Sequence, residues 1–196
     1  MKKILLALCL FFTLFSAFAE LTESQIATLT PIVMAQPALV IAANTGDNYA
    51  ISDWLNTRDE AFYVWKTYLQ TQDIFDNITW ANFTPQDAPD GTQAWANRSL
   101  ACQGKQFNVQ TLLTGRESIN PSKQKIRDGL QDALTAIPSG ANGATKAGGW
   151  NTVVAVMYRT ATRAEKYLSA GTGTTASPAM LVFEGFVTAQ EASLMR

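Results

Sequence analysis

Apolar residues recur every three or four positions between Trp150 and Leu168, and this spacing constrains the fold more than any other feature of the chain. A period near 3.6 residues places such side chains along one face of an α-helix. Gly171 follows where a glycine commonly ends a helix. The residues of this face are Trp150, Val153, Val154, Met157, Ala161, Ala164 and Leu168. The pattern predicts one continuous amphipathic helix and favours a mainly α fold.

Two more long helices are predicted upstream. Between residues 92 and 113, two apolar seams have a seven-residue spacing, one formed by Trp95, Cys102 and Val109 and the other by Leu100 and Phe107. Asn120 and Pro121 have the order of a helix cap followed by proline at the first helical position. The apolar face of that helix, which residues 138–140 bring to an end, consists of Ile126, Leu130, Ala133, Leu134 and Ile137.

Shorter helices are predicted near the start of the chain. Thr22 and Gln25 have the spacing of a capping box, in which each residue satisfies the backbone amide of the other. Pro31 and Pro37 are expected to limit the length of the helix that follows. Asp47 is expected to cap a second short helix.

The remaining segments predict loops and extended chain. Residues 73–89, with their Asp, Asn and Pro content, predict a loop. Phe62–Trp65 is aromatic and β-branched, which fits either a short strand or a buried helical turn. Residues 171–178 predict a flexible linker, and residues 179–188 alternate like a strand. This arm either folds back onto Phe62–Trp65 or adds to a neighbouring subunit, and we slightly favour the second alternative.

The first nineteen residues form a separate segment. Two lysines precede an apolar run over residues 4–18, and the run closes with an A-x-A pattern that ends at Ala19. These are the features of a secretory signal peptide with cleavage after Ala19. The alternative is a fused or miscalled leader. The predicted organisation is therefore a signal peptide over 1–19, one small helical domain of about five helices over 20–170, and a linker with a β-like arm over 171–196.

Composition excludes several kinds of chemistry. The chain has no histidine, which removes serine–histidine and cysteine–histidine catalysis and nearly every common zinc site. Lys and Arg number 15 against 16 Asp and Glu, a balance that argues against a nucleic-acid partner. Without the leader only Cys102 remains, so no internal disulfide can form, and this residue is expected to be buried.

No catalytic, cofactor-binding or metal-ligating residue is assigned from the sequence, and no cofactor or small-molecule substrate is expected. Five acidic residues are weighed as a carboxylate pair for hydrolysis, but nothing fixes their separation, and solvated surface acids are commoner: Asp53, Asp59, Glu60, Asp73 and Asp76. The five tryptophans fit either a sugar-binding surface or a core, and we favour the core.

A partner contact is the functional surface that the sequence does suggest. Arg159 and Arg163 lie four positions apart on the predicted last helix, with Lys166 on the same polar side. Apolar residues of the arm form the second part of this candidate surface. The candidate contact residues are Arg159, Arg163, Lys166, Leu181, Phe183 and Phe186.

Several motifs together resemble a family of small proteins encoded in the structural gene clusters of tailed phages and prophages. The shared order consists of an F-x-V-W-[KR]-T segment, an "NP" helix, an "ATRAE" helix and a "GTGT…P…FEG" arm. Here these are Phe62–Thr67, Ile119–Ser122 with Ile126-Arg127, Ala161–Lys166, and GTGTTASPA…FEG between Gly171 and Gly185. The resemblance covers residues 21–188 and implies no catalytic residues.

Two functions follow as hypotheses. The first, which we favour, is a non-enzymatic virion structural or assembly protein of the connector, neck or tail, which binds copies of itself or neighbouring virion proteins. It would be located in the host cytoplasm and then in the virion. The second is an exported, periplasmic small binding protein or envelope-acting accessory, which meets the membrane only transiently through its signal peptide. A secreted hydrolase using two carboxylates is a remote third reading.

Overall fold

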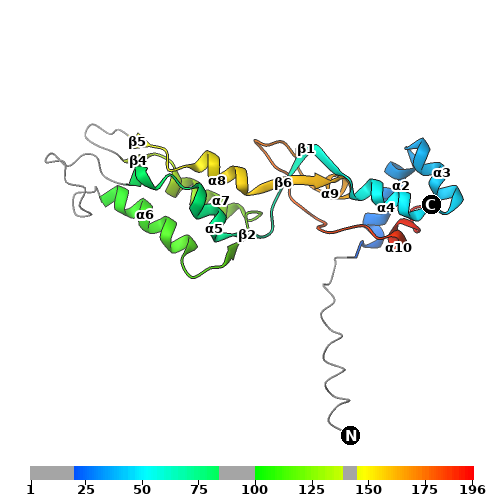
Figure 1. Ribbon diagram of the computed structural model, residues 1–196, viewed down its shortest axis with the longest axis horizontal. Helices are drawn as coiled ribbons and strands as arrows, with labels where there is room; N and C mark the ends of the chain where they lie inside the picture. Colours follow the sequence, from blue (N-terminus) through cyan, green and yellow to red (C-terminus); the bar gives the residue numbers. More distant parts are fainter. Residues whose placement is uncertain (1–19, 84–99, 139–144) are drawn as a thin grey trace, which may run out of the picture. The chain divides into compact units, whose positions relative to one another are not determined.

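The computed structural model describes residues 20–83, 100–138 and 145–196, and over these residues the protein is mainly α-helical (Figure 1). The prediction of a mainly α fold is confirmed. The expected count of about five helices is not, because the described residues form nine α-helices, most of them short. Residues 92–99, including Trp95, lie outside the described residues.

The described chain divides into two compact units, where the sequence suggested one helical domain followed by an arm. Unit 1 contains the described residues up to Arg58, Thr162–Leu168 and Val182–Arg196. Unit 2 contains Asp59–Ala161 and Ser169–Leu181. Each unit is therefore assembled from stretches that are far apart in the sequence.

The helices of unit 1 begin at local sequence signals. Thr22 caps α2 (Glu23–Met34) through the predicted capping box with Gln25. Pro31 does not end this helix, which continues for three further residues, so that prediction is wrong. Pro37 occupies the first turn of α3 (Pro37–Thr45), where a missing amide hydrogen costs nothing. As predicted, Asp47 caps α4 (Asn48–Asn56).

The core of unit 1 joins both ends of the chain. In Figure 1 the last helix, α10 (Ala189–Ala192, red), lies beside α4 (cyan), and the two elements are in contact. The short helix α9 (Arg163–Leu168) contributes Ala164. The buried residues are Leu21, Leu29, Val33, Leu39, Ala42, Ala43, Ile51, Leu55, Ala164, Phe183, Val187, Ala192 and Met195. The residues after Phe183 are thus part of a core.

The helices of unit 2 pack around a second apolar core. Its elements are α5 (Thr71–Asn77), the 3₁₀-helix η1 (Trp80–Phe83), α6 (Leu100–Leu113), α7 (Gln124–Leu134) and α8 (Trp150–Val156). As predicted, Ile126, Leu130, Ala133 and Leu134 of α7 pack into or against this core. The predicted end of the helix is wrong, because α7 ends at Leu134 and Ile137 lies on the strand β4 (Ile137–Pro138). The loop predicted over residues 73–89 is wrong for its described part, since α5 and η1 occupy it.

Two details of unit 2 differ from the sequence pattern. On α6, Cys102 and Val109 are buried as predicted, but Leu100 and Phe107 of the second seam are exposed. The helix expected at Pro121 begins at Gln124 instead. The Asn120 Oδ1 atom accepts a hydrogen bond from the Ser122 amide, so this segment forms a turn before the helix.

Three two-stranded pairings complete the structure, and the open question about Phe62–Trp65 is settled as a strand. β1 (Arg58–Trp65) pairs with β6 (Tyr158–Thr162). The two shorter pairs are antiparallel: β2 (Leu69–Gln70) with β3 (Ser118–Ile119), and β4 (Ile137–Pro138) with β5 (Thr145–Lys146).

The continuous helix predicted from Trp150 to Leu168 is wrong. The chain forms α8, then the strand β6, then α9. The residues between the helices are Tyr-Arg-Thr-Ala-Thr, and aromatic and β-branched residues favour strands where a partner is available. The partner β1 lies about 95 positions earlier in the chain and supplies those hydrogen bonds. The pairing with β1 therefore determines the conformation of residues 158–162, although their apolar spacing is that of a helix.

The tail folds back onto its own chain. Ala179 forms a parallel bridge with Val64, and Met180 an antiparallel bridge with Ala170. Of the two alternatives for the arm, the structure has the pairing with Phe62–Trp65. Beyond Met180 the predicted strand is wrong, because residues 181–188 have no regular structure.

The segment predicted as a linker is fixed by the same strand. The Tyr63 amide donates to the Gly173 carbonyl oxygen over 2.7 Å. Gly173 has φ of +67°, and an added Cβ would lie 2.1 Å from the Phe62 ring. Only glycine satisfies both conditions without strain.

Among the described residues, no single helix has the length and apolar character to cross a membrane. Taken together, α2 and α3 reach that length and composition, but they are bent by 114°.

Candidate functional site

The three basic residues predicted to share one helix face do not do so. Arg159 lies on β6 in unit 2, and its guanidinium donates to the Thr160 carbonyl oxygen. Arg163 and Lys166 lie on α9 in unit 1. The reason is the replacement of the predicted helix by α8, β6 and α9. The four-residue spacing of Arg159 and Arg163 therefore does not place them on one helix face.

Arg163 has a structural partner within unit 1. Its guanidinium lies 4.7 Å from the centre of the Trp54 ring and donates to the Trp54 carbonyl oxygen over 3.3 Å. Trp54 also stacks on Tyr167, with ring centres 6.3 Å apart. The Lys166 ammonium is 5.8 Å from the same Tyr167 ring. These contacts hold α9 against α4.

The apolar candidates separate into core and surface. Phe183 is buried in the core of unit 1, and Leu181 packs against a small cluster of Val64, Ala161 and Ala179 in unit 2. Phe186 differs because 59% of it is exposed. Of these three residues, Phe186 therefore retains the surface that a partner contact requires.

Motifs that are distant in the sequence meet around Trp65. The Arg127 guanidinium lies 4.2 Å from the centre of the Trp65 ring. It donates to the Pro121 and Ser122 carbonyl oxygens over 2.6 and 2.8 Å. The Ser122 amide in turn donates to the Lys66 carbonyl oxygen. Burial lowers the pKa of Arg127 below its ordinary value, and the nearby Asp128 opposes that effect. The F-x-V-W-K-T and "NP" motifs thus form one structural cluster.

The "ATRAE" motif forms a cap. The Thr162 amide donates to Glu165 Oε2 over 2.9 Å, and the Glu165 amide donates to Thr162 Oγ1 over 3.2 Å. This reciprocal pair is the capping-box arrangement, here almost fully buried, and it fixes the start of α9.

The acidic residues weighed for hydrolysis lie on three elements, α4, β1 and α5. Asp53 belongs to unit 1, and Asp59, Glu60, Asp73 and Asp76 to unit 2. Within the described ranges, no group of three or more His, Cys, Asp or Glu side chains is placed to hold a metal ion. The tryptophans support the core interpretation, because the four that are described pack in or against the two cores: Trp54, Trp65, Trp80 and Trp150.

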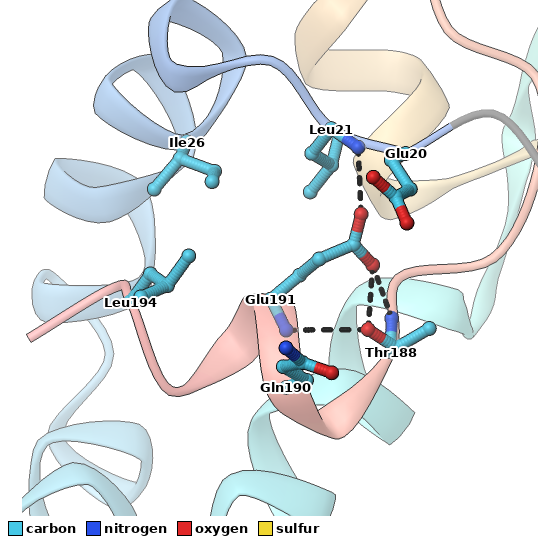
Figure 2. Close-up of a pocket in the computed structure, with 7 residues that line it drawn as sticks. All are labelled: Glu20, Leu21, Ile26, Thr188, Gln190, Glu191 and Leu194. Atoms are coloured by element: carbon cyan, nitrogen blue, oxygen red, sulfur yellow. Dashed lines mark hydrogen bonds between the residues drawn. The ribbon is translucent and has the colours of Figure 1, made fainter.

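A pocket in unit 1 brings the two ends of the described chain together (Figure 2). It has a volume of about 270 Å³. Its lining residues are Glu20, Leu21, Ile26, Thr188, Gln190, Glu191 and Leu194. The wall is thus partly apolar, from α2 and the C-terminal segment, and partly acidic.

Glu191 organises this pocket. Figure 2 shows its carboxylate between Leu21 and Thr188. One oxygen accepts the Leu21 amide over 2.6 Å, and the other accepts the amide and the hydroxyl of Thr188 over 2.7 and 2.8 Å. Glu191 is only 9% exposed. A buried carboxylate requires such donors, and these contacts satisfy both oxygens and fix the side chain in place.

Sequence reasoning missed Glu191. The T-x-x-E spacing from Thr188 to Glu191 is the same type of cap that predicted α2 correctly at Thr22, and it was available to predict α10. The bond to Leu21 had no such signal, because it joins residues 170 positions apart.

Comparisons with known proteins add no relative. No protein-family model, no curated protein and no solved structure matches the chain.

Proposed function

We propose that the protein is a non-enzymatic structural or assembly protein of a tailed-phage or prophage virion, acting in the connector, neck or tail region through contacts with copies of itself or with neighbouring virion proteins. The single observation that carries the proposal is the clustering of the motifs around Trp65. Residues 62–67, 119–122 and 127, which carry the resemblance to phage structural-cluster proteins, bind one another through Arg127 and the Ser122 amide.

This clustering favours a role in architecture. Residues that repeat across a family because of a reaction are expected to converge on a pocket, with polar atoms left to meet a substrate. Here the Arg127 guanidinium donates hydrogen bonds to the Pro121 and Ser122 carbonyl oxygens of its own chain. Under this proposal the shared motifs stabilise the fold, and the protein acts through the surface residues that contact its partners.

Each unit has exposed apolar side chains that could form contacts with other virion proteins. On unit 1 they include Tyr49 and Phe186, and on unit 2 they include Leu100 and Phe107. Large apolar residues left exposed are typical of surfaces that bind other proteins when they form patches. Phe186 is the candidate contact that the sequence also indicated.

The test is peptide mapping by mass spectrometry of density-purified particles from an induced culture that carries this gene. We expect the protein in stoichiometric amount in the particles. A Phe186→Ser chain should fold and yet be depleted from particles, whereas the control Ala155→Ser, an exposed change on α8, should be incorporated normally. Absence of the unaltered protein from particles would refute the proposal.

A second candidate is an exported small binding protein, and one observation favours it. Glu191 holds the backbone of Leu21, two residues beyond the predicted cleavage point at Ala19. An exported chain would begin at this contact. Under this candidate the protein is recovered from the periplasm and is absent from particles, so the same culture distinguishes the two functions.

A further inference from the structure

The chain is held firmly just beyond the predicted cleavage point. The Leu21 amide donates to Glu191 Oε1 over 2.6 Å, and both residues are buried. Thr22 follows directly with the capping box of α2. Residue 20 therefore lies at the edge of the ordered pocket, where a new chain end would be fixed relative to Glu191.

The pocket also lacks a positive charge. Two carboxylates line it, those of Glu20 and Glu191, and none of the described lining residues is basic (Figure 2). Backbone bond lengths place the Glu20 nitrogen within about 4 Å of the Leu21 nitrogen, and so within about 7 Å of the Glu191 carboxylate. A cation at the Glu20 nitrogen would bring a positive charge to a pocket wall that contains two carboxylates.

We propose that a host signal peptidase cleaves the Ala19–Glu20 bond, and that the new α-ammonium group of Glu20 binds the Glu191 carboxylate in this pocket. Cleavage is a hydrolysis, in which water adds across the peptide bond. Ala19 takes the new carboxylate, and Glu20 keeps the nitrogen as an amine. This amine is mostly protonated at neutral pH because the ordinary pKa of an α-amino group is about 7.7–8.0. The mature end thereby supplies the cation that the pocket lacks.

This inference rests on the second candidate function, the exported protein, and it adds how the chain matures and how unit 1 is completed. N-terminal amines are bound elsewhere by preformed acceptors in the same manner. Glu191 is suited to this role because its position is already fixed by Thr188, so binding the new end costs little additional ordering.

The first experiment establishes the chain end. The full chain is expressed with its leader in a Gram-negative host, and the exported protein is analysed by intact mass and N-terminal sequencing. We expect a single form that begins at Glu20. An intact chain beginning at Met1, or a mature form with another first residue, would overturn the proposal. Particle content is measured separately, so failure of this proposal can be told apart from failure of the proposed virion function.

The second experiment tests the bond to Glu191. Inserting Gly-Ser between Ala19 and Glu20 leaves the cleavage pattern in place but moves the ammonium group two residues away. The insertion is combined with Glu191→Gln, which keeps an acceptor for the Thr188 cap because glutamine also serves in capping boxes. Glu23→Gln is the matched control, since it removes the same charge from the exposed first turn of α2.

Stability of the purified exported proteins is measured by urea unfolding. We expect the insertion to raise the unfolding equilibrium constant about fivefold in the parent and in Glu23→Gln, the upper end for ion pairs that keep contact with solvent. In Glu191→Gln the insertion should have no effect. Equal stability of the parent with and without the insertion, or the same loss in all three backgrounds, would overturn the proposal. If Glu191→Gln does not fold, the parent comparison alone decides.

Discussion

Replacing Arg127 with methionine tests whether the motif cluster around Trp65 holds unit 2 together. Methionine keeps the unbranched apolar stem but removes the guanidinium. The change eliminates the stacking on Trp65 at 4.2 Å and two hydrogen bonds, to the Pro121 and Ser122 carbonyl oxygens.

The expected loss follows from those contacts. A cation over an aromatic ring contributes about 0.5–2 kcal/mol, and a hydrogen bond from a charged group contributes about 1.5–3 kcal/mol. Burial of Arg127 opposes its charged form, as its lowered pKa indicates, and this offsets part of the gain. We therefore expect Arg127→Met to lower the free energy of unfolding of unit 2 by about 2–4 kcal/mol.

The assay combines urea unfolding with hydrogen exchange. The Ser122 amide, which donates to the Lys66 carbonyl oxygen, reports the local effect and should exchange faster in the variant. Arg127→Lys should be intermediate, because lysine keeps the charge without the planar fork. Lys125→Met, an exposed change on the same helix, should stay within about 0.5 kcal/mol of the parent. Unchanged stability and exchange in Arg127→Met would refute the structural role of the cluster.

Two further substitutions have matched controls. Gly173→Ala should destabilise unit 2 by about 2–4 kcal/mol in thermal unfolding, because the added Cβ would overlap the Phe62 ring at positive φ. The control Gly115→Ala, also at positive φ but in open space, should cost only about 1 kcal/mol. Equal losses in the two variants would contradict the close approach of Gly173 to Phe62. Phe183→Ser should lower the free energy of unfolding in urea by about 3–5 kcal/mol, because Phe183 is only 3% exposed. Phe186→Ser should lower it by less than about 0.5 kcal/mol, because Phe186 is 59% exposed. Similar losses in the two variants would mean that the tail is not part of the core.

Local signals in the sequence predicted local structure well. The caps at Thr22 and Asp47 act within three or four residues, and the structure has both. The apolar face of α7 was equally readable, since its burial follows from periodicity within one helix. These elements need no information from distant parts of the chain.

Some local signals failed, such as Pro31 and the cap at Asn120, but the largest errors arose where a distant segment decides the conformation. Tyr158–Thr162 carries a helical apolar period, yet it is a strand because β1 pairs with it. The tail was assigned to an arm, yet Phe183 and Met195 complete the core of unit 1. The pocket at Glu191 depends on a bond between residues 170 positions apart, which no local pattern encodes. Pairings at such separations follow from the folded topology.

The composition of unit 1 from both ends of the chain sets an order of events during protein synthesis. The ribosome makes Leu29 and Val33 early, whereas Phe183, Val187 and Met195 of the same core are made much later. Unit 1 therefore closes only after these later residues have left the ribosome. Until then the nascent chain carries an open N-terminal apolar surface, which keeps it competent for chaperones or for a translocation channel that accepts unfolded polypeptide.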